Sequence, residues 1–223
     1  MKKLTALLMG VLLVFSITAC SSTSADKDSS ETNTESQVTD QASDKTPDNG
    51  AAEPIDSSDP TAATDGKTLI VYFSWSSNTE KMANTIKEQT GGDIFEIVPQ
   101  IPYPEDYTEC TEVALKERDE NARPKIKDLP ESLEEYSKIL IGYPIWWHTA
   151  PMVIGTFLEN YDLMGKEIYP FTQSASMDTE QFENSMEFVK ECAKNATVHD
   201  GLFVKATDTE GILAYLNENG LNQ

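Results

Sequence analysis

The pattern of apolar and polar positions divides the chain into three segments. After Lys2 and Lys3, residues 4–19 form an uncharged, largely apolar run of 16 residues. Residues 21–66 contain no aromatic residue and almost no large aliphatic side chain. From residue 67 to residue 223, short apolar runs alternate with stretches in which apolar residues recur at helical spacing. We therefore expect one folded domain, residues 67–223, preceded by two segments of a different character.

Short apolar runs rich in β-branched and aromatic residues predict strands in the folded segment. These runs cover residues 67–73, 93–98, 138–143, 166–171 and, more weakly, 198–204. Glu96 indicates that the second strand lies at a sheet edge, because a fully covered strand rarely carries a charge.

Helical periodicity predicts five helices between and after these strands. They are expected at residues 78–90, 108–121, from Pro151 onward, 178–194 and 209–219. Their inward faces should carry Met82, Ala83 and Ile86; Val113, Ala114 and Leu115; Val153, Ile154, Phe157 and Leu158; and Ile212, Leu213 and Leu216. Strands that alternate with helices predict an α/β fold, a doubly wound five-stranded parallel sheet covered on both faces. Ligands of such sheets bind at the carboxyl ends of the strands.

Charge excludes one class of function. The chain has 38 acidic and 17 basic residues, a net charge of −21, which argues against a nucleic-acid partner. The segment 67–223 holds 27 of these acids and 13 of the bases, a net of −14. Its 157 residues suffice for a core without disulfides, and three cysteines are too few for a disulfide scaffold.

The first segment has the features of an export signal. Its basic start and short apolar run fit a secretory signal better than a membrane span, which needs about 20 apolar residues. The run ends in Ile17-Thr18-Ala19-Cys20, which resembles the bacterial lipobox. This resemblance implies cleavage before Cys20, lipidation of Cys20, and an extracytoplasmic protein lipid-anchored to the bacterial cell membrane. An ordinary secretory signal with a chance cysteine is the alternative.

The second segment, residues 21–66, is expected to be a disordered acidic tether rich in Ser and Thr. It holds 11 acidic residues and two lysines, and it lacks the apolar area that would offset the entropy of ordering. A flexible coil of this length spans on the order of 35–40 Å. The alternative is that its acidic residues bind a metal or the cell wall.

The loop after the first predicted strand is a candidate anion site. It consists of Ser74, Trp75, Ser76, Ser77, Asn78 and Thr79, and it leads directly into a helix. The first turn of a helix presents unpaired N–H groups that bind anions. The loop has no Lys or Arg and lacks the glycine patterns of nucleotide-binding loops, which favours a phosphate held by neutral donors. A plain helix cap is the alternative.

The loop after the third predicted strand is aromatic. It contains Tyr143, Pro144, Ile145, Trp146, Trp147 and His148. Because neighbouring residues of an extended chain face opposite ways, one tryptophan should belong to the core and the other should be available to a planar ligand. The alternative is that both are structural. His148 is the candidate acid or base of the site, although a hydrogen-bonded loop histidine is the commoner case.

The fourth predicted strand ends in a loop of small polar residues. These are Thr172, Gln173, Ser174, Ala175 and Ser176, which could approach the edge of a ring through their backbone N–H groups. They could equally form the cap of the next helix, with Asp178 as the N-cap and Gln181 three residues on.

Together, the three loops resemble the flavodoxin family. Ser74, Ser76, Asn78 and Thr79 are similar to its phosphate loop, and Tyr143 to Trp147 resemble the flavin-contacting loop of flavodoxin-like quinone reductases. Residues 103–107 and Arg123-Pro124 are similar to a subgroup of flavodoxin-like lipoproteins. The resemblance covers residues 67–223. It implies strand order 2-1-3-4-5, FMN as cofactor, and two further loops that embrace the isoalloxazine ring.

The implied function is an FMN-dependent oxidoreductase or an electron-transfer flavoprotein, with a small molecule or a protein as redox partner. His148 is its candidate catalytic residue, and no metal site is expected. The alternative is a non-catalytic surface module that has lost tight flavin binding, since Ser77 stands where the family usually has Gly and residues 172–177 lack glycine. In the implied topology, Cys110 and Cys192 lie too far apart to form a disulfide.

Overall fold

The strands of the sheet are all parallel and confirm the expected order. The fold is seen in a computed structural model, which describes residues 66–223. The strands are β1 (Lys67–Tyr72), β2 (Asp93–Glu96), β3 (Tyr136–Pro144), β4 (Glu167–Gln173), β5 (Thr197–Val198) and β6 (Leu202–Phe203). Their order is β2-β1-β3-β4-β5, with β6 also paired to β4. The signal segment 1–20, the candidate lipidation site Cys20 and the tether up to residue 65 lie outside the described residues.

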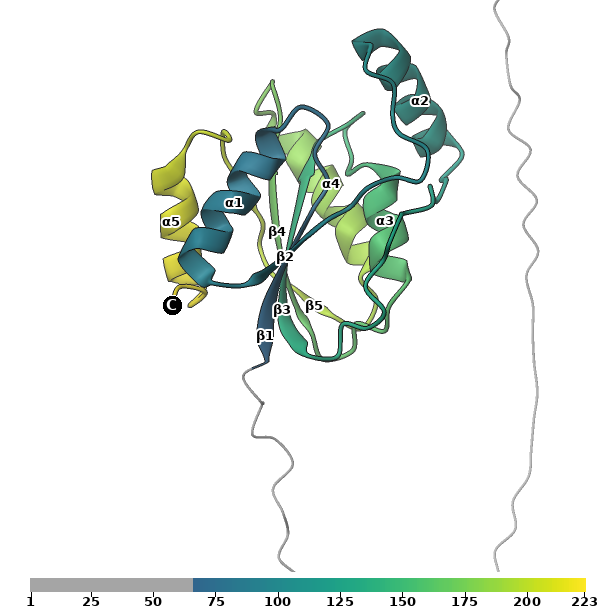
Figure 1. Cartoon of the computed structure of the whole chain (residues 1–223). Helices are drawn as coiled ribbons and strands as arrows, with labels where there is room; N and C mark the ends of the chain where they lie inside the picture. The colour runs from purple at the N-terminus through teal and green to yellow at the C-terminus, as the bar shows by residue number, and fades with distance from the viewer. Residues whose placement is uncertain (1–65) are drawn as a thin grey trace, which may run out of the picture. The chain divides into compact units, whose positions relative to one another are not determined.

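Five helices cover the sheet. They are α1 (Asn78–Thr90), α2 (Tyr107–Asp119), α3 (Met152–Glu159), α4 (Thr179–Cys192) and α5 (Thr209–Glu218). Helices α1 and α5 pack on one face, and α3 and α4 pack on the other (Figure 1). Helix α2 lies beyond α3, toward the carboxyl ends of the strands, which is the edge where ligands of such sheets bind.

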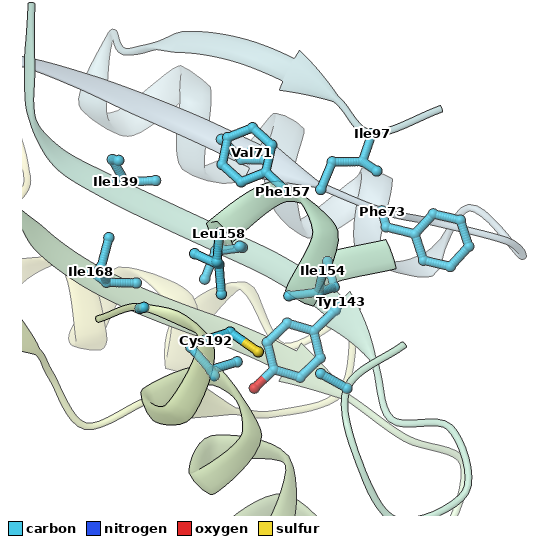
Figure 2. Packing of buried hydrophobic residues seen from close by; sticks show 14 of the residues in the cluster. Val71, Phe73, Ile97, Ile139, Tyr143, Ile154, Phe157, Leu158, Ile168 and Cys192 are labelled. Carbon is cyan, nitrogen blue, oxygen red and sulfur yellow. The ribbon is translucent and has the colours of Figure 1, made fainter. Parts of the chain in front are cut away.

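The core consists of two apolar layers, one on each face of the sheet. In one layer, Val71, Ile139 and Ile168 from the sheet meet Ile154, Phe157 and Leu158 from α3 (Figure 2). In the other, Ile70 and Leu140 meet Met82, Ile86, Ile212 and Leu216 from α1 and α5. Each of these side chains is fully buried, or nearly so, which stabilises the fold by about 1.5–3 kcal/mol per side chain. Consecutive strand residues thus serve opposite layers, which is why the strands are uninterrupted apolar runs.

Several expectations need correction at the level of elements. The fifth strand is two short strands, β5 along the start of β4 and β6 along its end. Between them Gly201 touches α4 so closely that a Cβ would lie 2.6 Å from Met186 Sδ. Pro151 is the N-cap of α3 and not its first helical residue. Val113 and Leu213 are exposed, in contrast to their expected inward positions.

The two cysteines of the folded part are free. Cys110 in α2 and Cys192 in α4 are both buried and unbridged, as the topology predicts. Within residues 66–223, no helix has the length and apolar character that crossing a membrane requires.

Candidate functional site

The start of α1 is not an ordinary serine cap. Ser77, its N-cap residue, has φ 60° and ψ 7°, in the left-handed region, and its side chain makes no capping hydrogen bond. The first intrahelical bond runs from Lys81 N to Ser77 O, at 3.2 Å. The N–H groups of the turn before Lys81 therefore have no intrahelical acceptor and remain available to an anion.

Two buried hydroxyls beside this helix start lack partners. Ser74 Oγ and Thr79 Oγ1 are inaccessible to solvent and form no hydrogen bond in the described part of the chain. Thr79 as a residue is only 1% exposed. A buried hydroxyl without a partner costs about 1–3 kcal/mol, so such positions persist where a ligand satisfies them. Unpaired donors at a helix N-terminus fit a phosphate group.

An aromatic cavity of about 240 Å³ lies next to this loop. It is lined by Trp75, Ile145, Trp146, Trp147 and His148, together with Tyr107, Cys110, Thr111 and Ala114 of α2 and Gln181 of α4. The loops after β1 and β3, which the sequence suggested separately, therefore meet here. Their aromatic rings give the cavity flat apolar walls, which suit a planar ligand.

The two adjacent tryptophans have different roles, as expected. Trp146 packs edge-on against Phe73 and Tyr103, with ring centroids 5.3 and 5.0 Å apart. Trp147 is 40% exposed. Its Nε1 donates to Thr111 O at 2.8 Å, and the guanidinium of Arg118 lies 5.6 Å from its ring centroid. Trp146 is thus anchored in the core, while Trp147 presents its ring at the surface of the cavity.

Trp147 and His148 occupy a strained turn. Their φ values are 48° and 66°, and reciprocal backbone hydrogen bonds of 2.9 and 3.0 Å join Trp146 and Thr149 on either side. Positive φ at both central residues is the geometry that normally selects Asn-Gly. The strained turn holds the indole of Trp147 and the exposed imidazole of His148 at the cavity, so strain is concentrated where binding is expected.

The loop after β4 lies against the aromatic loop but does not line the cavity. Pro144 pairs with Gln173, and Ile145 N donates to Gln173 O at 3.2 Å. The capping alternative is confirmed for the residues that follow, because the Asp178 side chain accepts from Gln181 N at 3.0 Å. No side chain from Thr172 to Ser176 is among those that line the cavity.

Two residues predicted to contact the ring, Tyr143 and Thr172, are both completely buried. Their side chains are therefore not available to a ligand, whereas the predicted backbone contact of Thr172 stays a prediction. The hydroxyl of Tyr143 lies 3.3 Å from Ser185 Oγ beneath α4, and the hydroxyl of Thr172 donates to Tyr143 O. These side chains pack beneath the loops and not at the cavity, because the last residues of β3 and β4 are still part of the core. Figure 2 shows the Tyr143 ring among the core side chains.

Sequence reasoning missed the contribution of α2 and Gln181 to the cavity. Tyr107, Cys110, Thr111 and Ala114 all come from the first two turns of α2. A signal was present, because Asp106 caps α2 by accepting from Glu109 N at 3.0 Å, which fixes the start of the helix. The helix follows β2 and therefore begins at the ligand-binding edge.

Fold and site together define a doubly wound α/β protein whose carboxyl edge suits a planar ligand bearing a phosphate. Comparison with known families supports this class: a family model described as flavodoxin matches residues 67–219. The chain belongs to the flavodoxin family. A comparison with curated proteins found no match.

Solved structures agree with this family. A protein of Bacteroides eggerthii assigned as a flavoprotein is 31% identical, with a TM-score of 0.60, covering 69% of this chain and 97% of that one. A second, from Bacteroides uniformis, is 30% identical, with a TM-score of 0.60 and coverages of 68% and 98%. A flavoprotein of Lactobacillus acidophilus in complex with FMN is 28% identical, with a TM-score of 0.54 and coverages of 65% and 97%. Family membership and these neighbours support FMN as the cofactor.

Proposed function

We propose that the chain is an FMN-dependent oxidoreductase or electron-transfer flavoprotein tethered to the outer face of a bacterial cell membrane. The observation that carries the cofactor part is the pair of buried, unpartnered hydroxyls of Ser74 and Thr79 at the start of α1. They stand beside an aromatic cavity of a shape suited to a flat ring system. When bound, FMN would supply one- or two-electron redox chemistry.

The proposed roles of the residues follow from their positions. The hydroxyls of Ser74 and Thr79 and the free N–H groups of α1 would hold the phosphate without any basic side chain. Trp147 and Trp75 would flank the ring and exclude water from it. His148, exposed at the cavity, is the candidate that would hold or release a proton next to the ring.

The proposed location depends on Cys20. Two ester-linked acyl chains on Cys20, with an amide-linked third, would anchor the protein stably, whereas a single chain holds only marginally. The tether of residues 21–66 would then let the domain reach redox partners on the order of 35–40 Å from the anchor.

The cofactor proposal is tested by titrating the chain with FMN, FAD and riboflavin and following flavin fluorescence. We expect FMN to bind most tightly, because the loop has donors for one phosphate but no second element for the remainder of FAD. Thr79→Val should weaken FMN at least tenfold, since a hydrogen bond to a charged group contributes about 1.5–3 kcal/mol. Riboflavin, which has no phosphate, should bind the variant and the natural chain equally.

Thr85→Val is the matched control. It removes a hydroxyl from the same helix, one that is exposed and donates to Lys81 O at 3.1 Å. This variant should leave FMN affinity unchanged. If riboflavin binds as tightly as FMN, the phosphate site is wrongly assigned. If no flavin binds at micromolar concentration, the chain is better explained as a non-catalytic surface module.

A further inference from the structure

A second cavity, larger than the first, lies on the outer side of α2. Its volume is about 600 Å³, within the range of small-molecule sites, and it runs between residues 100–104, α2 and residues 122–125. Its walls are mainly apolar, with Ile101, Pro102, Pro104, Val113 and Pro124 among them. Ile101 is 84% exposed, unusual for a large aliphatic side chain at the rim of a groove. We call this cavity the α2 groove.

The α2 groove contains a half-buried carboxylate. Glu117 of α2 lines the groove, and its Oε2 accepts a hydrogen bond of 2.6 Å from the hydroxyl of Tyr103. Burial raises the pKa of Glu117, and the Tyr103 hydrogen bond is the only influence that opposes it. A carboxylate removed from water is normally paired with a cation, but here a tyrosine hydroxyl is the only partner the structure gives it.

Two basic side chains, Arg123 and Lys125, line the groove with Glu117, and neither pairs with it. Arg123 also lines the groove, yet its guanidinium makes two hydrogen bonds to Glu159, of 2.7 and 2.8 Å. Its Nη1 donates to the carbonyls of Asn121 and Ala122, and its Nη2, which also donates to Glu159, approaches Cys192 Sγ. Lys125 also lines the groove, and within residues 66–223 it makes no ion pair with Glu117. Among residues 66–223, Glu117 therefore has a hydrogen bond from Tyr103 but no ion pair.

We propose that the α2 groove binds a small organic amine in its protonated form. The ammonium would pair with Glu117 and lie near the ring of Tyr103, while its hydrocarbon part would cover Ile101, Val113 and the prolines. A domain of net charge −14 favours a cation over a neutral or anionic ligand. This proposal does not depend on FMN binding, because none of its residues belongs to the phosphate loop or lines the aromatic cavity.

The α2 groove and the aromatic cavity share a wall. Tyr103 lines the groove, and its ring packs edge-on against Trp146, which lines the cavity, with centroids 5.0 Å apart. Occupation of the groove would thus press on a ring that faces the cavity. An amine bound there is well placed to modulate the cavity without entering it.

The test is a calorimetric titration of the full chain, saturated with FMN, with 2-phenylethylamine and with its neutral analogue 2-phenylethanol. We expect the amine to bind at least tenfold more tightly, because only the amine can form the charge-assisted bond to Glu117. Glu117→Gln keeps an acceptor for the Tyr103 hydroxyl but removes the charge, so it should abolish this preference. Glu112→Gln, an exposed change on the same helix, should leave it intact.

Thermal unfolding of Glu117→Gln, together with its FMN affinity, establishes whether the variant is folded. If it is not, Ile101→Ser replaces an exposed rim residue and should weaken the amine without affecting the fold. Equal affinities for amine and alcohol, or no amine binding at millimolar concentration, would overturn the proposal. Repeating the titration without FMN, on the natural chain and on Glu117→Gln, separates the two sites: a preference for the amine that persists in Glu117→Gln would place the amine in the aromatic cavity and also overturn the proposal.

Discussion

At the scale of single residues, backbone strain marks the site. In the described part of the chain, positive φ angles outside glycine occur at Asn121, Asp128 and Asn195, and at Ser77, Trp147, His148 and Met177. Asn, Asp and His tolerate this conformation best among non-glycine residues, so the first three and His148 need no special explanation. Ser77, Trp147 and Met177 lie in, or directly after, the loops that follow β1, β3 and β4. Strain not explained by residue type is thus confined to the three loops at the ligand-binding edge.

Ser77→Gly should stabilise the protein by about 1 kcal/mol. The left-handed conformation costs a non-glycine residue about 1–2 kcal/mol, and the greater freedom of glycine in the unfolded chain offsets part of that gain. Urea unfolding of the FMN-free protein measures the difference. Ser76→Gly in the same loop has no positive φ to relieve and should not stabilise. A destabilised Ser77→Gly protein would mean that the serine side chain contributes more than its strain costs.

Sequence identified the residues of the loops better than their orientations. The hydroxyl-rich loop after β1 was predicted from its residue types. The different positions of Trp146 and Trp147 were predicted from the alternation of extended chain, but they arise from a turn in which Trp147 has a positive φ. The left-handed conformation of Ser77 could not be predicted, because serine as a residue type gives no indication of a positive φ. The burial of Tyr143 and Thr172 depends on where β3 and β4 end, which an apolar run defines only to within a few residues.

At the scale of elements, α2 is the helix least attached to the core. Only Cys110 and Ala114 of its residues are buried, and its periodicity is correspondingly weak. Its links to the aromatic loop include the bonds from Trp147 Nε1 to Thr111 O and from Arg118 to Trp147 O. The sequence predicted this helix and the position of Cys110 near its start at the ligand-binding edge. It did not predict that the helix lines the cavity, because periodicity gives the inward face of a helix and not the neighbour it covers. The division of the fifth strand into β5 and β6 was also not predicted. The close approach of Gly201 to α4, which lies between the two strands, is a tertiary contact that the sequence pattern does not show.

FMN should protect Cys110 from thiol reagents. Cys110 is buried at the cavity, and burial and the Glu117 carboxylate both raise the pKa of its thiol, so it reacts only when α2 moves away. A cofactor that fills the cavity suppresses this opening by up to about 100-fold at a hundredfold excess over Kd. Iodoacetamide labelling followed by mass spectrometry measures the rate with and without FMN.

Cys192 in α4 is the internal control for this labelling. It is buried as deeply but is not among the residues that line the aromatic cavity. Its labelling rate should change much less than that of Cys110. Equal protection of both cysteines would indicate global stabilisation, and no protection of either would place FMN away from α2.

At the scale of the whole molecule, net charge bears on the partners that the proposed redox function would allow. Residues 21–66 add 11 acids and two bases to a domain that already has a net charge of −14. An acidic chain is repelled by anionic lipid and by other acidic surfaces. If the proposed redox function is right, its partner should therefore carry a basic or neutral contact surface.

Cys20→Ser should release the protein from the membrane or mislocalise it. If Cys20 carries the acyl chains, its loss removes the anchor and leaves a protein without a membrane-spanning helix among residues 66–223. Fractionation of cells and metabolic labelling with a fatty acid measure both effects. Ser21→Ala, next to the proposed cleavage site, is the matched control and should remain membrane-bound. Lipid label that persists in Cys20→Ser would contradict the anchor.

The reduction potential of bound FMN should rise with ionic strength. Reduction adds negative charge to a site inside a domain of net charge −14, so the surrounding carboxylates oppose it and lower the potential. Raising the salt from about 0.01 M to about 1 M shortens the screening length from about 30 Å to about 3 Å, which removes most of this opposition. Glu80→Gln, in the first turn of α1, should raise the potential more than Glu218→Gln, at the far end of α5, because Glu80 lies beside the phosphate loop. Spectroelectrochemical titration of each variant, with free FMN in the same buffers as reference, measures these shifts. A potential that is independent of salt, or equal shifts in the two variants, would show that local hydrogen bonds and not the acidic surface set it.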